Sequence, residues 1–294
     1  MRTKETEISG RRTLLTAGTA TAAAFLTGAP AHAATTDRLR ELESRHGARL
    51  GVFAHNLVTK RTVHHRADER FPICSLFKTL AAAAVLRDLD RDGEVLGKRV
   101  HYTADDVVEN SDITEDHVAT GMTVAELADA AIRFSDNTAG NLLLRELGGP
   151  SAITRFARSL GDPATRLDRW EPELNSAEPW RRTDTTTPRA IGRTYARLVL
   201  GDALNRADRG LLTHWMLNNT TSVNRFRAAL PKSWALADKT GGGSYGTNND
   251  AGIAWTDDGT PLVLVVQTTK PEQDAVPDHA LIVETAKLLT ETLT

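Results

Sequence analysis

A serine and a lysine three residues apart, inside a long apolar run, constrain this chain more than any other feature. Ser75 and Lys78 lie within residues 71–89, which are otherwise rich in alanine and leucine. On a helix, residues three apart share one face, so the lysine amine would lie beside the serine hydroxyl. A lysine whose pKa is lowered by burial or by a positive neighbour can take the hydroxyl proton. The run therefore predicts a nucleophilic serine at the start of a buried helix.

Taken alone, the pair has a simpler interpretation, a helix cap followed by a surface lysine. At ordinary residue usage such a pair arises by chance about once in a chain of this length. Two later tripeptides occur once each, and they are Ser135-Asp136-Asn137 and Lys239-Thr240-Gly241. All three motifs in this order would arise by chance in roughly a few chains in a thousand. The three motifs together therefore favour a nucleophilic serine at position 75, which none of them supports alone.

Residues 169–184 form a loop by composition, because they show no helical or strand period and include two prolines. Arg169 and Asp184 stand at the two ends with opposite charges, so an ion pair between them could close an Ω-loop. Composition alone leaves a second interpretation open, a surface connection with scattered carboxylates. From Glu171 to Asn175 the loop reads Glu-Pro-Glu-Leu-Asn.

Together, the three motifs and this loop resemble the class A serine β-lactamases, over essentially all of the chain beyond residue 34. S-x-x-K, S-D-N and K-T-G mark that family and the penicillin-binding proteins, and the E-x-x-L-N pattern from Glu171 is the other distinctive mark of class A. The resemblance implies that Ser75 attacks a β-lactam carbonyl, with Lys78 as base or proton carrier. It also implies that Ser135 relays a proton to the leaving nitrogen. Glu171 and Asn175 would hold the water that hydrolyses the acyl-enzyme.

The same resemblance implies how the substrate is held and how the loop is supported. The backbone N–H groups of Ser75 and Gly242 would stabilise the oxyanion. Lys239 would attract a substrate carboxylate, and its charge would favour a neutral Lys78. A cis bond is implied before Pro172. Substrate-binding positions are implied for Asn137, Asn175, Arg225, Lys239, Thr240, Gly241 and Gly242, and supporting positions for Asn141, Arg169 and Asp184.

Arg225 is assigned because another position lacks a charge. In many class A enzymes an arginine at the position of Asn248 supports the substrate carboxylate, and here that arginine is missing. A subset of the family instead uses an arginine from the segment before the K-T-G strand, and Arg225 stands in the matching place. A guanidinium holds a carboxylate through a planar fork, which a lysine lacks. The alternative is that Arg225 is an exposed surface cation.

Three further positions bear on specificity and stability. Asn110 stands where the family usually has an aromatic residue beside the site entrance. Cys74 is the single cysteine, so no internal disulfide forms, and its apolar context favours a small buried hydrophobe over a catalytic thiol. Gly243 stands where some carbapenem-hydrolysing relatives have a cysteine that bridges to the position of Cys74, which argues against that activity.

The first 34 residues have the features of an export signal. Basic residues precede a mild apolar run at residues 14–26, and the run ends at a small-residue site near Ala33. Arg11 and Arg12, with the weak hydrophobicity of the run, favour the twin-arginine route and secretion from a bacterium. The run is too short and too polar for a transmembrane anchor. We therefore expect residues 1–34 to be removed.

The rest of the chain shows two kinds of periodicity. A first helix is capped near Thr36, and residues 75–218 are mostly helical. An amphipathic helix at residues 278–293 closes the chain. Strand-like patterns occur towards both ends of the chain, at residues 49–57, 61–65, 234–238, 251–255 and 262–268.

These patterns predict an α+β fold, with an antiparallel sheet built from both chain ends, flanking helices and an all-helical domain. The sheet domain would take residues 35–66 and 217–294. The helical domain would take residues 67–216, with the Ω-loop at residues 169–184. By resemblance, this is the architecture of the serine β-lactamases and DD-peptidases.

The implied function is hydrolysis of the β-lactam amide of penicillins and cephalosporins through a serine acyl-enzyme, which confers β-lactam resistance. Two alternatives share the three motifs. A penicillin-binding DD-peptidase would lack the Glu171 loop, and a non-hydrolytic β-lactam sensor domain would need a transmembrane tether. The formal net charge is −2, which gives no reason to expect nucleic acid or an anionic membrane as partner. The histidines show no metal-ligand spacing, so we expect a monomer with a small-molecule substrate and no metal or cofactor.

Overall fold

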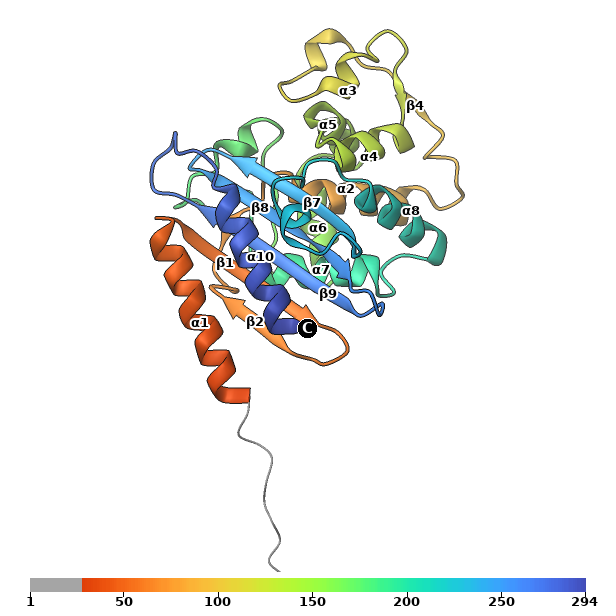
Figure 1. The fold of residues 1–294 in the computed structure, drawn as a ribbon. Helices are drawn as coiled ribbons and strands as arrows, with labels where there is room; N and C mark the ends of the chain where they lie inside the picture. Colours follow the sequence, from red (N-terminus) through yellow and green to blue (C-terminus); the bar gives the residue numbers. More distant parts are fainter. Residues whose placement is uncertain (1–27) are drawn as a thin grey trace, which may run out of the picture.

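The computed structural model describes residues 28–294 and centres on a five-stranded antiparallel sheet (Figure 1). The strands lie in the order β2-β1-β9-β8-β7. Their bounds are β1 (Arg49–Asn56), β2 (Thr62–His65), β7 (Ala235–Gly243), β8 (Thr247–Trp255) and β9 (Pro261–Thr269). Because β1 pairs with β9, the sheet joins the two ends of the chain. The predicted α+β fold class is confirmed.

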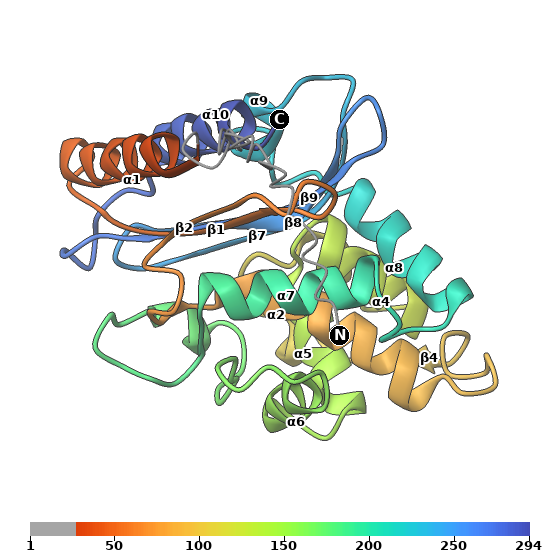
Figure 2. The ribbon, with the colours of Figure 1, turned by 90° about the horizontal axis from the view of Figure 1, so that it is seen from below.

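Helices cover both faces of the sheet, as Figure 2 shows. α1 (Gly28–Arg45) and α10 (His279–Leu293) pack on one face through buried leucines. α7 (Pro188–Val199) packs on the other face. Gly192 allows α7 to approach β1, since a Cβ at this position would lie 2.8 Å from the Phe53 ring.

α1 starts earlier than the sequence predicted. It begins at Gly28, whereas we expected a cap near Thr36. Alanine has the highest helix propensity and is frequent in residues 29–34, and Pro30 falls in the first turn, where a proline is tolerated. The helix therefore crosses residue 34, the predicted end of the export signal. Residues 1–27 of that signal lie outside the described part of the chain.

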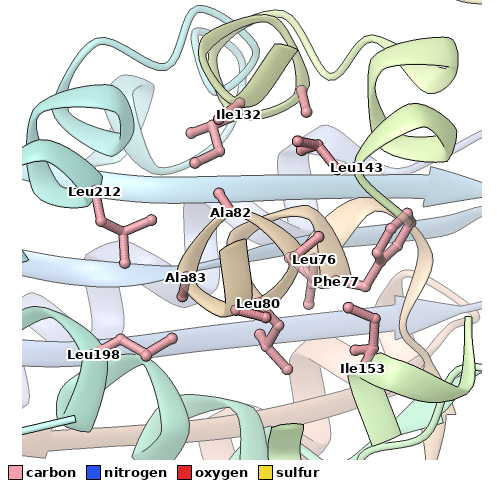
Figure 3. Close-up of a cluster of buried hydrophobic side chains, with 14 of the residues drawn as sticks. Leu76, Phe77, Leu80, Ala82, Ala83, Ile132, Leu143, Ile153, Leu198 and Leu212 are labelled. Carbon is pink, nitrogen blue, oxygen red and sulfur yellow. The ribbon is translucent and has the colours of Figure 1, made fainter. Parts of the chain in front are cut away.

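α2 (Phe77–Ala84) is the centre of the helical part, and all of its residues are buried. A 3₁₀ turn at Cys74–Leu76 precedes it, and a π-helical turn at Val85–Leu89 follows it. Figure 3 shows Leu80 and its neighbours on α2 among apolar side chains from the surrounding helices. Besides α7, these helices are α4 (Val124–Arg133), α5 (Asn137–Glu146), α6 (Ser151–Ser159) and α8 (Arg206–Leu217). Core packing thus holds α2, the helix that follows Ser75, in place.

Short elements complete the fold. They are α3 (Asp112–Glu115), α9 (Phe226–Ala229), and the strand pairs β3 (Phe71–Pro72) with β6 (Thr185–Thr186) and β4 (Arg99–Val100) with β5 (Met122–Thr123). The β3–β6 pair joins the segment before Ser75 to the segment that leaves the Ω-loop. Within residues 28–294, no helix is both long and apolar enough to cross a membrane. The division into two domains after residues 66 and 216 stays a prediction.

β7 and β8 are longer than the sequence predicted. β7 extends beyond the K-T-G motif, and β8 begins earlier, beside that extension. We expected strands at residues 234–238 and 251–255, but β7 continues to Gly243 and β8 starts at Thr247. The extensions pair with each other, and Gly242 lies opposite Asn248. Glycine and asparagine have low strand propensity and indicate a turn. Here cross-strand pairing and burial override that preference.

Candidate active site

Ser75 lies at the entrance to α2, in the 3₁₀ turn Cys74–Leu76. Its side chain is 7% exposed and lines a cavity of ≈ 250 Å³. Cys74 has a left-handed backbone with φ of 44°, which turns the chain into the helix. No side chain in the described part of the protein caps this turn. Its N–H groups can therefore stabilise negative charge that develops near Ser75.

Lys78 is fully buried in the first turn of α2, and its ammonium contacts three acceptors. It donates to Ser135 O at 2.7 Å and to Asn137 Oδ1 at 2.6 Å. Its Nζ lies 3.0 Å from Glu171 Oε1, so the three donors of the ammonium all have partners. Gly140 on α5 makes room for this side chain, because a Cβ there would lie 2.9 Å from Lys78 Cε.

Glu171 brings a carboxylate to the same point from the Ω-loop. Its Oε1 accepts from Ser75 Oγ at 3.5 Å and also faces Lys78. Its Oε2 accepts from Asn175 Nδ2. The bond between Glu171 and Pro172 is cis, which confirms the implied geometry. A carboxylate in this place can take a proton from the serine, or from a water beside it.

Asn141, Arg169 and Asp184 hold the loop in place. Asn141 donates its Nδ2 to Glu171 O at 2.8 Å and accepts from Glu171 N at 2.9 Å. It therefore binds the backbone of the glutamate and leaves the carboxylate to its contacts with Ser75, Lys78 and Asn175. Arg169 Nε donates to Asp184 Oδ2 at 2.6 Å, which confirms the predicted ion pair between the ends of the Ω-loop.

The turn before α5 presents the S-D-N motif. Ser135 has a left-handed backbone with φ of 62°, and Asn137 lines the cavity. Asp136 points away from the cavity and had no role in the sequence analysis. Its carboxylate accepts from Ala139 N at 2.8 Å, as the cap of α5, and from Thr114 N at 2.9 Å. An aspartate directly before a helical run is the sequence signal for such a cap.

β7 forms the opposite side of the site. Lys239 is fully buried and donates to Ser135 Oγ and to Thr240 O, both at 3.0 Å. Burial, and then the charge of Lys78, lowers the pKa of Lys239 well below its ordinary value. Gly241 allows β7 to pass close to the Ser75 turn, because a Cβ at this position would lie 3.2 Å from the Cys74 Cβ.

Arg225 reaches the cavity from the segment before β7. Its Nε donates to Asn248 Oδ1 at 2.6 Å, and its Nη1 donates to Thr221 O at 2.6 Å. Burial lowers the pKa of Arg225, but an arginine remains charged at any physiological pH. Because Arg225 lines the same cavity as Ser75, its position favours carboxylate binding over an exposed surface cation.

The structure brings the predicted site residues together. Lys78, Glu171 and Lys239 lie behind the cavity wall, buried. The sequence analysis did not predict that Phe134 and Thr221 line the cavity. Phe134 adds an aromatic ring to the cavity wall, where Asn110 has none. Thr221 gave no sequence signal. The residues that line the cavity are Ser75, Asn110, Phe134, Ser135, Asn137, Asn175, Thr221, Arg225, Thr240, Gly241 and Gly242.

This arrangement can carry out acyl transfer on a small anionic substrate. It has a serine beside a helix start, a buried lysine–carboxylate pair behind that serine, and a second serine hydrogen-bonded to a lysine. Arg225 and the Thr240 hydroxyl face the same cavity, so they can bind a carboxylate while the serine attacks a carbonyl.

Comparison with known proteins identifies similar chains. A family model described as "Beta-lactamase enzyme family" matches residues 34–293. A β-lactamase from Streptomyces fradiae is 62% identical, covering 94% of this chain and 94% of its own length. One from Streptomyces cellulosae is 60% identical, covering 93% of this chain and 89% of its own length. The solved structure of the β-lactamase from Streptomyces albus G has 61% identity and a TM-score of 0.88, covering 89% of this chain and 100% of its own. An ancestral class A β-lactamase has 50% identity and a TM-score of 0.84, covering 87% of this chain and 99% of its own.

Proposed function

The chain belongs to the β-lactamase enzyme family as a class A serine enzyme, and on this premise we propose which of its residues carry the reaction. It hydrolyses the β-lactam amide and confers resistance to β-lactam antibiotics. The relatives described above are β-lactamases, so the DD-peptidase and sensor alternatives gain no support from them.

In the acylation step that we propose, Ser75 Oγ attacks the carbonyl carbon of the β-lactam ring, and the ring C–N bond then breaks. The backbone N–H groups of Ser75 and Gly242 stabilise the oxyanion. The Ser75 proton leaves through Glu171 or Lys78, which share one buried ion pair beside it. Ser135 delivers a proton to the ring nitrogen, and its contact with Lys239 supports this relay. The convergence of Ser75, Lys78 and Glu171 is the observation that carries the proposal.

In the deacylation step, a water attacks the ester carbonyl of the acylated Ser75. Glu171 takes a proton from that water as general base, and the C–O bond to Ser75 breaks, so that the serine recovers its proton. Asn175 donates to Glu171 Oε2 and can hold the same water. The clamp from Asn141 to the Glu171 backbone keeps the carboxylate at the reacting centre.

We also propose how the substrate is oriented. Arg225 and Thr240 bind its carboxylate from the cavity wall, and the buried charge of Lys239 attracts it from behind that wall. Asn137 holds the side-chain carbonyl of the substrate from the opposite side.

Residues 1–34 serve as a twin-arginine export signal. The Arg11-Arg12 pair and the apolar run that follows it support this export route. The enzyme then acts outside the cell as a monomer.

The function is tested with a chromogenic cephalosporin and intact-protein mass. A hydrolase gives fast colour, and the protein returns to its unmodified mass within an hour. An adduct that persists would support the sensor or DD-peptidase alternative. Ser75→Ala should abolish both colour and adduct, because Ser75 is the cavity hydroxyl that lies beside the Lys78–Glu171 pair. Residual turnover within about tenfold of the parent would contradict the role of Ser75.

A further inference from the structure

The guanidinium of Arg225 is held at two of its three nitrogens. Nε donates to Asn248 Oδ1 and Nη1 donates to Thr221 O, both at 2.6 Å. Among residues 28–294, no hydrogen bond uses Nη2. A guanidinium is planar, so acceptors on two of its nitrogens fix its plane and the direction of the Nη2 N–H groups. Since Arg225 lines the cavity, those groups are available to a ligand there.

Asn248 can present only its oxygen to Arg225. Its Nδ2 donates to Asp278 O at 3.0 Å and lies 3.4 Å from His279 Nδ1. A backbone carbonyl only accepts, so the nitrogen end of the amide must face Asp278. Asn248 is fully buried, and its own backbone oxygen accepts from Thr268 Oγ1 at 3.0 Å. The start of α10 therefore fixes the amide, and the amide fixes the guanidinium.

A neutral acceptor at this place orients Arg225 without cancelling its charge. The region already contains two fully buried acids, Asp238 and Asp250. Asp250 Oδ2 accepts from Phe226 N at 3.1 Å, next to Arg225 in the chain. A carboxylate at position 248 would pair with the guanidinium and compete with an anionic substrate. An apolar residue there would leave Nε buried without a partner, which is costly.

We propose that Asn248 is a positioning residue of the carboxylate pocket, which acts by aiming the Nη2 group of Arg225 into the cavity. The inference rests on the proposed role of Arg225 as a carboxylate ligand. Asn248 itself does not line the cavity, so it does not contact the substrate.

The test measures KM and kcat for a penicillin and for its methyl ester. Asn248→Ala should raise KM for the penicillin about 5- to 20-fold, as expected for a weakened charge-assisted contact, with kcat within about twofold of the parent. The ester has no carboxylate, so its KM should not change. Because KM does not depend on how much protein is folded, partial loss of stability does not disturb this measurement.

Asn56→Ala is the matched control. Asn56 is also buried, and its Nδ2 donates to Leu293 O at 3.0 Å, so it ties β1 to the last turn of α10 as Asn248 ties β8 to the first. This control should lower the melting temperature and leave KM for the penicillin unchanged.

A double variant separates positioning from a general structural role. In the Arg225→Ala background, Asn248→Ala should add nothing to KM, because it acts only through Arg225. An equal increase in both backgrounds would overturn the inference. If Asn248→Ala keeps the parental KM while Arg225→Ala raises it, the inference fails and the proposed role of Arg225 stands. If Arg225→Ala leaves KM unchanged, that proposed role fails and the inference fails with it.

Discussion

Glu171 Oε1 lies 3.0 Å from Lys78 Nζ, and both side chains are fully buried. The same oxygen is 3.5 Å from Ser75 Oγ, so one carboxylate faces both the nucleophile and the amine. A buried ion pair retains its charges only when both partners are well satisfied. Lys78 has two more acceptors, Ser135 O and Asn137 Oδ1. The pair is therefore held from two elements, α2 and the Ω-loop.

Glu171→Ala should separate the two halves of the reaction. The variant lacks the general base for the hydrolytic water, so deacylation should slow by roughly 10²- to 10⁴-fold. Acylation should continue, because Lys78 keeps its contacts with Ser135 and Asn137. Intact-mass measurement after mixing with a penicillin should show an accumulating acyl-enzyme. If turnover falls and no adduct appears, Glu171 acts before acylation.

Cys74→Ala should leave the enzyme active. Cys74 is fully buried, and burial raises the pKa of its thiol, so it remains a neutral packing group. Removing one sulfur atom from the core should cost about 1 kcal/mol of unfolding free energy. Thermal or urea unfolding and kcat with a cephalosporin measure the two effects. A folded variant without turnover would show that the thiol takes part in the reaction.

The sequence predicted the site better than the elements that carry it. Ser75 and Lys78 could be named from their spacing on a helix, and Glu171 from the resemblance of its loop to that of class A β-lactamases. The ends of β7 and β8 could not, because Gly242 and Asn248 have turn-like propensities and become strand only through their partners across the sheet. The resemblance implied that Asn141 hydrogen-bonds Glu171, but that its amide binds the backbone of Glu171 depends on a tertiary arrangement that no local pattern reveals. For the same reason, the wall position of Thr221 gave no signal.

As the pH rises, activity should be lost at a lower pH than the pH at which an ordinary lysine loses its proton. Because burial and the charge of Lys78 lower the pKa of Lys239, its ammonium loses a proton below the usual lysine pKa. The neutral amine no longer attracts a carboxylate, so kcat/KM for penicillins should decrease as the pH rises through that lowered value. Lys239→Arg keeps its charge to a pKa above about 12 and should shift this decrease to higher pH. Identical pH profiles for parent and variant would contradict the assignment.

The charge of Arg225 should be needed for carboxylate-bearing penicillins. Arg225 lines the cavity. Many class A enzymes have an arginine at the position of Asn248, and Arg225 takes the place of that arginine here. Loss of a charge-assisted hydrogen bond costs on the order of 1.5–3 kcal/mol, so Arg225→Ala should lower kcat/KM roughly 10- to 150-fold. Arg225→Lys keeps the charge without the planar fork and should give an intermediate value.

Moving the arginine to the neighbouring strand should restore part of this loss. Asn248 lies on β8 opposite Gly242, and its side chain touches the guanidinium of Arg225. In the double variant Arg225→Ala with Asn248→Arg, the new side chain can occupy the volume that Arg225 vacates and return a guanidinium to the same pocket. The measurement is kcat/KM for a penicillin in the parent, both single variants and the double variant. Full parental kcat/KM in Arg225→Ala, or no recovery in the double variant, would mean that Arg225 does not carry the carboxylate contact.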